Sequence, residues 1–252
     1  MTASEIIAAM YDSRTLVYGH RGARAYAPMN TLPSFELAVQ QGAHGVELDV
    51  HRSKDGYPVI CHDFTVDSTT DGSGRVTEMT LGQLKALDAG VRFDPRFAGT
   101  RIPTLDEVFE AVGKRVFVNV EIKSESVETD GVEQITADCI TRHNMQARVI
   151  VSSFNPLALK RFRAILPDVP IGFLYAADSP AEVHTLIQGL AYEAYHPHYE
   201  LIDSALVAEA KKAGHIINTW TVNDPLRAQG LRDLGVQGII TDKPDIILDA
   251  LK

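Results

Sequence analysis

The sequence predicts an α/β fold, a (βα)8 TIM barrel with a small insertion after the first β-hairpin. The chain has 252 residues, 45% of them apolar, which suffices for one large buried core. Short β-type runs alternate with amphipathic helical stretches along the whole chain, and repeated strand–helix units imply a parallel sheet covered on both faces. One of the nine strand candidates belongs to a hairpin, so eight parallel strands remain, the number that closes a barrel.

The strand candidates are residues 16–19, 45–50, 58–62, 116–122, 148–152, 170–174, 191–195, 215–222 and 237–241. Helices are expected between most of them, at residues 31–41, 104–112, 130–143, 156–166, 181–188, 203–213 and 225–234. The helix at 104–112 opens with Thr104, and Glu107 follows three residues later, which is the pattern of a capping box.

The hairpin is predicted from Asp55-Gly56, a strong signal for a two-residue turn. Such a turn pairs residues whose numbers sum to 111, so we expect Asp49 to lie opposite His62. The second arm runs antiparallel to its partner and is therefore an appendage of the barrel.

Residues 64–103 interrupt the alternation of strands and helices. They contain the turn-rich stretch 71–74 and one short helical piece at 81–87, and they are too long for a simple loop. We therefore expect a single domain, residues 1–252, in which the insertion 64–103 stands over the mouth of the barrel.

Composition excludes several classes of function. The formal charge of −9 argues against a broad basic surface for nucleic acid or anionic lipid. No run approaches the ~18 apolar residues of a membrane span, and residues 1–11 do not resemble a signal peptide. Cys61 and Cys139 are too few for a disulfide framework, which fits a reducing compartment. We expect a cytoplasmic protein without nucleic-acid partners or stable membrane association; the oligomeric state stays open.

Carboxylates gather where barrel enzymes place their functional residues, at the C-terminal ends of the strands. Glu47 and Asp49 are spaced by two and share one face of their strand, and Glu121 ends another strand. Three converging carboxylates repel one another unless a cation compensates them. An all-oxygen set suits a hard divalent ion, Mg²⁺ or Ca²⁺. The alternatives are an outward polar face for Glu47 and Asp49, and a buried ion pair between Glu121 and Lys123 without a catalytic role.

Two histidines and two cations are expected at the same mouth. His20 and His62 can divide general-base and general-acid duties near neutral pH, although a lone histidine is as often a hydrogen-bonded core residue. Arg21 and Lys123 add positive charge, and a guanidinium is well matched to two phosphate oxygens. Acidic residues for a metal beside basic residues for an anion indicate a phosphate ester as substrate.

Ten short segments stand in order along the chain: HRG at 20–22, APMNT at 27–31, GVELDV at 45–50, KDG at 54–56, VICHD at 59–63, IPTL at 102–105, VNVEIK at 118–123, SSF at 152–154, WTVN at 220–223 and TDKP at 241–244. Together they resemble the glycerophosphodiester phosphodiesterase family of the bacterial cytoplasmic type. Each segment alone is weak evidence, but the ordered set spans nearly the whole chain. The resemblance implies the same barrel with an insertion after the hairpin.

The resemblance also implies a reaction and its residues. One divalent cation, Mg²⁺ or Ca²⁺, would be held by Glu47, Asp49 and Glu121, with His20 and His62 as the acid/base pair. Arg21 and Lys123 would bind the phosphate, and Trp220 is expected to form a wall beside the glycerol, with plain packing as the alternative. The substrates implied are small glycerophosphodiesters, such as glycerophosphocholine and glycerophosphoethanolamine, cleaved to sn-glycerol 3-phosphate and an alcohol. A neighbouring glycerol hydroxyl would attack the phosphate to give a cyclic phosphate, which water then opens.

One position departs from the family pattern: Met29 stands where the family has Glu in Pro-Glu-Asn-Thr. Methionine cannot carry charge, so we expect altered metal affinity or substrate preference with activity retained. Two alternatives stay open, a phospholipase D-like lipid phosphodiesterase and a catalytically silent barrel that binds phosphate esters. His196 and His198, which flank a proline, are read as solvated loop histidines, with a place for one of them in the pocket lining as the alternative. Cys61 is read as a core residue.

Overall fold

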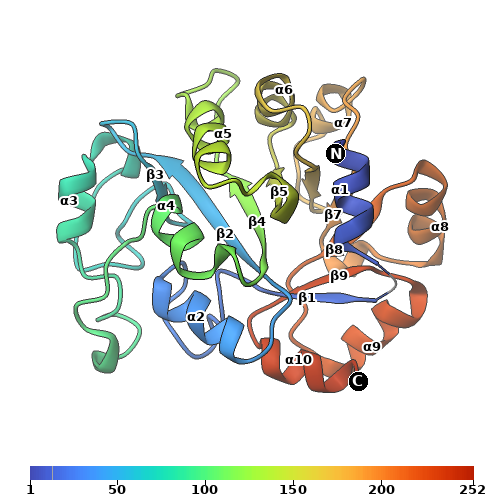
Figure 1. Ribbon diagram of the computed structural model, residues 1–252, viewed down its shortest axis with the longest axis horizontal. Helices are drawn as coiled ribbons and strands as arrows, with labels where there is room; N and C mark the ends of the chain where they lie inside the picture. Colours follow the sequence, from blue (N-terminus) through green and yellow to red (C-terminus); the bar gives the residue numbers. More distant parts are fainter. Residues whose placement is uncertain (13) are drawn as a thin grey trace.

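The computed structural model describes residues 1–12 and 14–252 of the chain. Eight parallel strands close into a barrel because β1 pairs with both β2 and β9 (Figure 1). The strands are β1 (Leu16–Gly19), β2 (Gly45–Arg52), β3 (Pro58–Ile60), β4 (Phe117–Ile122), β5 (Val149–Ser153), β6 (Ile171–Tyr175), β7 (Ala194–Pro197), β8 (Ile216–Thr219) and β9 (Gly238–Thr241). β3 is antiparallel to β2 and stands outside the barrel. The predicted (βα)8 barrel is confirmed.

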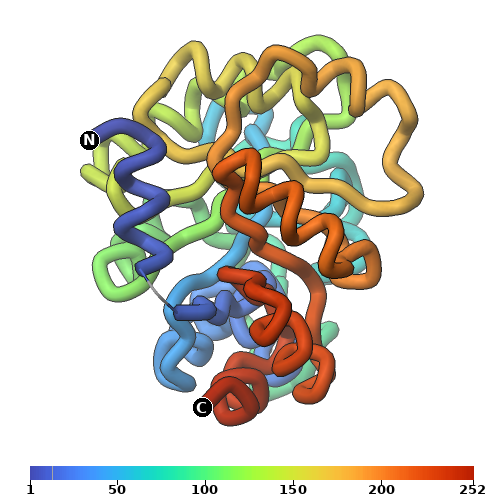
Figure 2. Tube along the Cα trace, turned by 90° about the vertical axis from the view of Figure 1, so that its right-hand side faces the viewer, coloured from blue at the N-terminus to red at the C-terminus, as the bar shows by residue number. Residues whose placement is uncertain are grey.

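Helices cover the outside of the barrel (Figure 1). The α-helices of the described residues are α1 (Ala3–Met10), α2 (Leu32–Gln40), α3 (Leu81–Ala86), α4 (Leu105–Val108), α5 (Val132–Arg142), α6 (Pro156–Ile165), α7 (Val183–Leu186), α8 (Ser204–Ala213), α9 (Pro225–Leu234) and α10 (Pro244–Ala250); α1 and α3 lie apart from the helices that cover the outside of the barrel. The sequence predicted α2 to α9 and missed α1 and α10. Figure 2 shows these two helices on separate parts of the surface. Among the described residues, no helix is long and apolar enough to cross a membrane.

Local chemistry explains where several helices begin. α6 and α9 both have a proline in the first turn, preceded by a residue whose side chain accepts a backbone N–H: Asn155 from Leu157, and Asp224 from Arg227. α4 opens with the predicted capping box of Thr104 and Glu107, but after four residues it continues as a π-helical turn to Gly113.

α1 closes the N-terminal end of the barrel. Ile6, Ile7 and Met10 belong to one apolar cluster with Leu16, the first residue of β1, and with Phe117, the first residue of β4. The sequence did not predict this helix because a short helix is stabilised mainly by packing, and the strand ends on which it packs come from distant parts of the chain.

The β2–β3 hairpin has a longer turn than predicted. Ser53 and Tyr57 are joined by a hydrogen bond from the Ser53 amide to the Tyr57 carbonyl at 2.9 Å, so three residues form the loop. Gly56 closes the loop with a φ of 91°, a left-handed conformation that glycine adopts without steric cost.

The longer turn changes the register of the hairpin. Observed partners such as Val50 and Ile60 sum to 110, and the Cys61 amide donates to the Asp49 carbonyl at 3.1 Å. The prediction that Asp49 lies opposite His62 is therefore wrong by one residue. Cys61 is 4% exposed, which confirms its assignment to the core.

The segment 64–103 builds a small apolar cluster of its own against the hairpin. Val66, Val76, Leu84 and Ile102 pack there with Val59 of β3. α3 lies in this segment beside β3, at one flank of the molecule (Figure 1). Its cluster is separate from the apolar layer between the barrel strands and their helices.

His196 lies inside the barrel, which corrects the expectation of a solvated loop histidine. Its side chain is completely buried, and burial lowers its pKa to about 3, so the ring is neutral. The predicted strand 191–195 starts three residues too early; β7 runs from Ala194 to Pro197 and includes His196. Gly172 of β6 makes room for the ring, because a Cβ there would lie 2.5 Å from Nε2 of His196.

Candidate active site

A cavity of about 160 Å³ opens among the C-terminal ends of the barrel strands. It is lined by His20, Arg21, Glu47, His62, Asn119, Glu121, Phe154, Leu174, Trp220 and Ile240. Six of the eight residues singled out in the sequence are in this lining. The other two, Asp49 and Lys123, lie directly behind it, since Nζ of Lys123 is 2.7 Å from Oε1 of Glu121 and 3.4 Å from Oδ1 of Asp49.

Three buried carboxylates meet at this cavity. Glu47 and Asp49 project from β2, and Glu121 projects from β4, where it is the register partner of Asp49. Their exposed fractions are 4%, 1% and 8%. One carboxylate oxygen of each lies within 4.8 Å of the others, so the three can share a single ion.

Burial and mutual repulsion set the electrostatics of these carboxylates. Burial, followed by the charges of Asp49 and Glu121, raises the pKa of Glu47 well above its usual range. Burial also raises the pKa of Glu121 to about 7, against the opposing effect of Lys123. Burial works in the same direction on Asp49, but there Lys123 and Arg21 prevail and hold its pKa below the usual value.

The donor set fits a hard divalent cation. Oδ1 of Asp49 and Oδ1 of Asn119 are buried oxygens without a hydrogen-bond donor among the described residues. Asn119 is the register partner of Glu47, so its amide belongs to the same end of the barrel. Oxygen ligands of this kind are those that Mg²⁺ and Ca²⁺ prefer.

Arg21 and Asn30 hold the carboxylates in place. The backbone amide of Arg21 donates to Oε2 of Glu47 at 3.0 Å, and Nε of Arg21 lies 3.4 Å from Oδ2 of Asp49. Nδ2 of Asn30 donates to the same oxygen of Asp49 at 2.8 Å. Nη1 of Arg21 contacts Sδ of Met29 at 3.4 Å. Sequence reasoning gave Asn30 no role, although it stands in the quoted segment APMNT.

His20 and His62 are both oriented by carboxylates. Nδ1 of His20 lies 2.7 Å from Oδ1 of Asp242, and Nδ1 of His62 lies 2.6 Å from Oδ1 of Asp63. Because Nδ1 is occupied in each ring, Nε2 is the nitrogen available to the cavity that both residues line. Burial lowers the pKa of His20 to about 4, against the hydrogen bond to Asp242, and burial also lowers the pKa of His62.

The sequence indicated the two carboxylates that orient the histidines, Asp63 and Asp242, only by their position near strand ends. Asp242 directly follows β9, and Asp63 lies three residues after β3. Both were visible as polar residues at strand ends, but their contacts with the histidines were not predicted.

Trp220 packs against other aromatic rings at the mouth of the cavity. Its ring meets Phe154 edge-on, with centroids 5.4 Å apart, and meets His198 in the same way at 5.1 Å. Nε1 of Trp220 donates to the carbonyl of His196 at 2.9 Å. The indole is therefore held in one orientation, with Phe154 beside it in the lining of the cavity.

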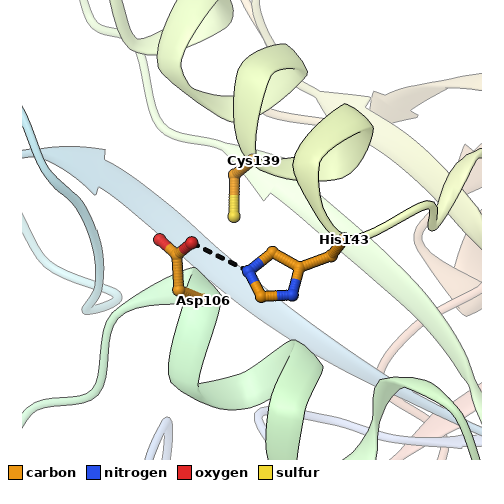
Figure 3. Close-up of side chains that lie close together, drawn as sticks. All are labelled: Asp106, Cys139 and His143. Atoms are coloured by element: carbon orange, nitrogen blue, oxygen red, sulfur yellow. Dashed lines mark hydrogen bonds and ion pairs between the residues drawn. The ribbon is translucent and has the colours of Figure 1, made fainter.

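A second group with metal-ligating atoms joins α4 to α5, where Asp106, Cys139 and His143 lie together (Figure 3). Oδ1 of Asp106 already accepts from Nε2 of His143 at 2.8 Å and from Nη2 of Arg142 at 2.6 Å. Burial and the charge of Asp106 raise the pKa of the Cys139 thiol, so it stays protonated. A neutral thiol and an arginine-paired carboxylate make this cluster a cross-link between helices.

Comparisons with known proteins agree over most of the chain. The sequence profile of the Glycerophosphoryl diester phosphodiesterase family matches residues 20–246. A glycerophosphodiester phosphodiesterase from Caldanaerobacter subterraneus subsp. tengcongensis is 42% identical over 95% of this chain and 98% of its own. One from Bacillus altitudinis is 32% identical over 92% and 96%.

Solved structures agree with the sequence relatives. An Oleispira antarctica phosphodiesterase in complex with the product sn-glycerol-3-phosphate superposes with a TM-score of 0.84 at 33% identity, covering 96% of this chain and 98% of that one. A glycerophosphodiester phosphodiesterase from Agrobacterium tumefaciens superposes with a TM-score of 0.78 at 28% identity, covering 93% and 99%.

Proposed function

We propose that this chain, which belongs to the glycerophosphoryl diester phosphodiesterase family and is an enzyme of that class, cleaves small glycerophosphodiesters. Examples are glycerophosphocholine and glycerophosphoethanolamine. The products are sn-glycerol 3-phosphate and an alcohol. The observation that carries the proposal is the cavity in which three carboxylates, two histidines and an arginine converge. The relative from Oleispira antarctica, which holds sn-glycerol-3-phosphate, supports the choice of product.

Glu47, Asp49 and Glu121 would hold one divalent cation, Mg²⁺ or Ca²⁺. When bound, such an ion neutralises phosphate charge and lowers the pKa of a hydroxyl beside it. The ion would also offset the burial and the repulsion from Asp49 and Glu121 that raise the pKa of Glu47, and it would bind Oδ1 of Asp49, which accepts no hydrogen bond from the described residues.

His20 and His62 would move the protons of the reaction. One imidazole accepts the proton of the attacking glycerol hydroxyl while its oxygen forms a bond to phosphorus. The other donates a proton to the departing alcohol oxygen as the bond from phosphorus to that oxygen breaks, which leaves a cyclic phosphate. Water would then open the ring: its oxygen forms a bond to phosphorus while one bond from phosphorus to a glycerol oxygen breaks, and sn-glycerol 3-phosphate results.

Burial lowers the pKa of His20, so its ring is neutral at pH 7 and would be the acceptor. His62 would be the donor and must then carry a proton on each nitrogen; burial lowers its pKa, but the charge of Asp49 and the hydrogen bond with Asp63 oppose this effect. Arg21 and Lys123 would bind the phosphate oxygens, as a guanidinium and an ammonium do best.

The apolar side of the cavity would receive the carbon atoms of the substrate. Trp220 and Phe154 form a fixed aromatic pair there, and Trp220 would contact the glycerol. The insertion 64–103 would support the opposite side of the mouth. Its Ser68 donates to Oδ2 of Asp63, the residue that orients His62.

We place the enzyme in the cytoplasm, with small molecules as its partners. The support is that Cys61 and Cys139 are both free thiols, as expected in a reducing compartment.

The test is release of glycerol 3-phosphate from glycerophosphocholine by the purified protein, with EDTA and then with Mg²⁺, Ca²⁺ or Mn²⁺. We expect metal-dependent product that disappears in His20→Ala and persists in His184→Ala, an exposed histidine outside the cavity. No product from any glycerophosphodiester with any of these metals would favour a silent barrel. Cleavage of intact phospholipid alone would favour a phospholipase D-like enzyme.

A further inference from the structure

Behind His20 lies a chain of hydrogen bonds that the reaction as proposed above does not use. Oδ1 of Asp242 is bonded to Nδ1 of His20 at 2.7 Å, and Oδ2 of Asp242 accepts from Nδ2 of Asn223, also at 2.7 Å. Oδ1 of Asn223 in turn accepts from the backbone amide of Asp242 at 2.9 Å and from the hydroxyl of Thr241 at 3.0 Å. Asn223 and Asp242 are thus joined by two hydrogen bonds, one donated by each residue.

The direction of each bond in this chain is determined. A backbone N–H can only donate, so the side-chain atom of Asn223 that faces the Asp242 amide must be its oxygen. Its NH₂ group must then face the Asp242 carboxylate. An ionised carboxylate only accepts, so the proton between Asp242 and His20 must sit on Nδ1 of His20. Nε2 of a neutral ring is left without a proton.

The charges around Asp242 keep it an acceptor. Nε of Arg24 lies 3.3 Å from Oδ1 of Asp242. Burial opposes ionisation, but the hydrogen bond from His20 and the charge of Arg24 hold the pKa of Asp242 below its usual value. The nearest competing group is the hydroxyl of Thr221, whose oxygen lies 3.4 Å from Nδ1 of His20, a longer contact than that of Asp242.

We propose that Asn223 and Asp242 are positioning residues that select the tautomer of His20, through the obligatory chain from the Asp242 backbone amide to Nδ1. This inference rests on the proposed function, in which His20 transfers a proton through Nε2. The pair delivers an unprotonated Nε2 to the cavity, the form that accepts a proton.

The substitution Asp242→Asn inverts the last link of the chain. The NH₂ group of Asn223 still requires an acceptor, so the new amide turns its oxygen toward Asn223 and its own NH₂ group toward His20. Arg24, whose Nε lies 3.3 Å from the atom of residue 242 that faces His20, loses its acceptor there. Nδ1 must then accept, and the ring proton moves to Nε2. Loss of the correct tautomer in a comparable carboxylate–imidazole pair costs on the order of 10⁴-fold in kcat, and we expect a loss of about 10²- to 10⁴-fold here.

The exchanged variant Asp242→Asn/Asn223→Asp restores the original order. A carboxylate at position 223 accepts from the backbone amide, from the hydroxyl of Thr241 and from the NH₂ group of the new amide at 242. The oxygen of that amide then faces His20, and the proton returns to Nδ1. The exchange conserves net charge and the number of atoms, so it should recover at least about tenfold in kcat over Asp242→Asn.

The experiment combines ¹⁵N NMR of histidine-labelled protein at pH 7 with kinetics on glycerophosphocholine, both with Mg²⁺. The spectrum of His20→Ala identifies the His20 signals. We expect the proton on Nδ1 in the wild type, on Nε2 in Asp242→Asn and again on Nδ1 in the exchanged variant. The loss should fall on kcat, with KM within about threefold. The exposed Asp168→Asn should match the wild type in both readouts.

The two hypotheses fail in different ways. A ring that keeps its proton on Nδ1 in Asp242→Asn, or an exchanged variant that does not return it there, would overturn the tautomer inference while wild-type activity stands. A wild type that releases no glycerol 3-phosphate would overturn the proposed function, and the NMR readout would still decide the tautomer. If Asp242→Asn does not fold, the exchanged variant alone decides, because it must fold and carry the proton on Nδ1.

Discussion

Asp49 and Glu121 stand side by side on neighbouring parallel strands, paired in register, with Nζ of Lys123 within 3.4 Å and 2.7 Å of their respective oxygens. Two buried carboxylates in direct register are costly unless opposite charge accompanies them. Lys123 supplies one charge, but burial and, to a lesser extent, the charge of Asp49 still raise the pKa of Glu121 to about 7. The arrangement therefore favours an additional cation.

Adding Mg²⁺ should stabilise the protein against unfolding, because a ligand that binds only the folded state adds about 2.7 kcal/mol at 100 times its Kd. Asp49→Asn removes one of the three carboxylate charges and should abolish most of this stabilisation. Thermal unfolding with EDTA and with increasing Mg²⁺ measures it. Asp106→Asn, in the cluster between α4 and α5, is the control and should keep the full response to Mg²⁺. Equal responses of all three proteins would contradict the assignment.

Met29→Glu should change the constants for metal and substrate. Nη1 of Arg21 now contacts Sδ of Met29, and a carboxylate there would pair with the guanidinium and compete with Asp49 for it. We expect at least about a threefold change in the Kd for Mg²⁺ or in KM, which corresponds to about 0.7 kcal/mol. Met29→Leu keeps an apolar side chain of similar volume and serves as the control. Unchanged constants in Met29→Glu would refute the idea that this position tunes the site.

Gly172→Ala should destabilise the barrel by about 1–3 kcal/mol, because the new Cβ would lie 2.5 Å from a completely buried histidine ring. Urea unfolding measures the difference. Gly230→Ala is the matched control: Gly230 lies within α9 with nothing within 4 Å of a new Cβ, and alanine there should stabilise by about 0.5–1 kcal/mol. A destabilisation of equal size in both variants would argue against the steric explanation.

Stability should fall as the pH drops below about 6.5, the usual pKa of histidine. Burial lowers the pKa of His196 to about 3 and those of His20 and His51 to about 4. Between the usual pKa and these lowered values, the histidines bind protons in the unfolded chain but not in the folded chain. The free energy of unfolding therefore decreases as the pH falls through this range. His196→Gln removes one of these groups and should make the loss between pH 6 and pH 4.5 smaller. Unfolding free energies at several pH values decide it; an unchanged pH slope would mean that His196 is protonated in the folded state.

The elements that the sequence predicted well depend on local chemistry. β1 and α9 have their predicted bounds. The apolar run of β1 ends at Gly19, and α9 begins at Pro225, directly after its N-cap residue Asp224. The spacing of Glu47 and Asp49 placed both on one face of β2, and the barrel rule placed that face at the mouth, where the structure has them.

The hairpin marks the limit of local prediction. Asp55-Gly56 correctly indicated a tight turn, but the choice between two and three loop residues decides which residue lies opposite Asp49. That choice is made by the packing of both arms, including the bond from the Leu81 amide to Oδ1 of Asp55. A difference of one residue in register is invisible to turn propensity.

By itself, the sequence determined the alternation of strands and helices, the barrel, and the set of polar side chains at its mouth, because periodicity, capping and turn chemistry act over a few residues. Only the tertiary structure decided which of these side chains touch. His20 and Asp242 are 222 positions apart and meet because β1 and β9 close the barrel. His196 is buried because β7 runs from Ala194 to Pro197 and includes it, whereas the local sequence pattern predicted a strand that ends at residue 195. Contacts between distant segments depend on closure and register, which no local pattern encodes.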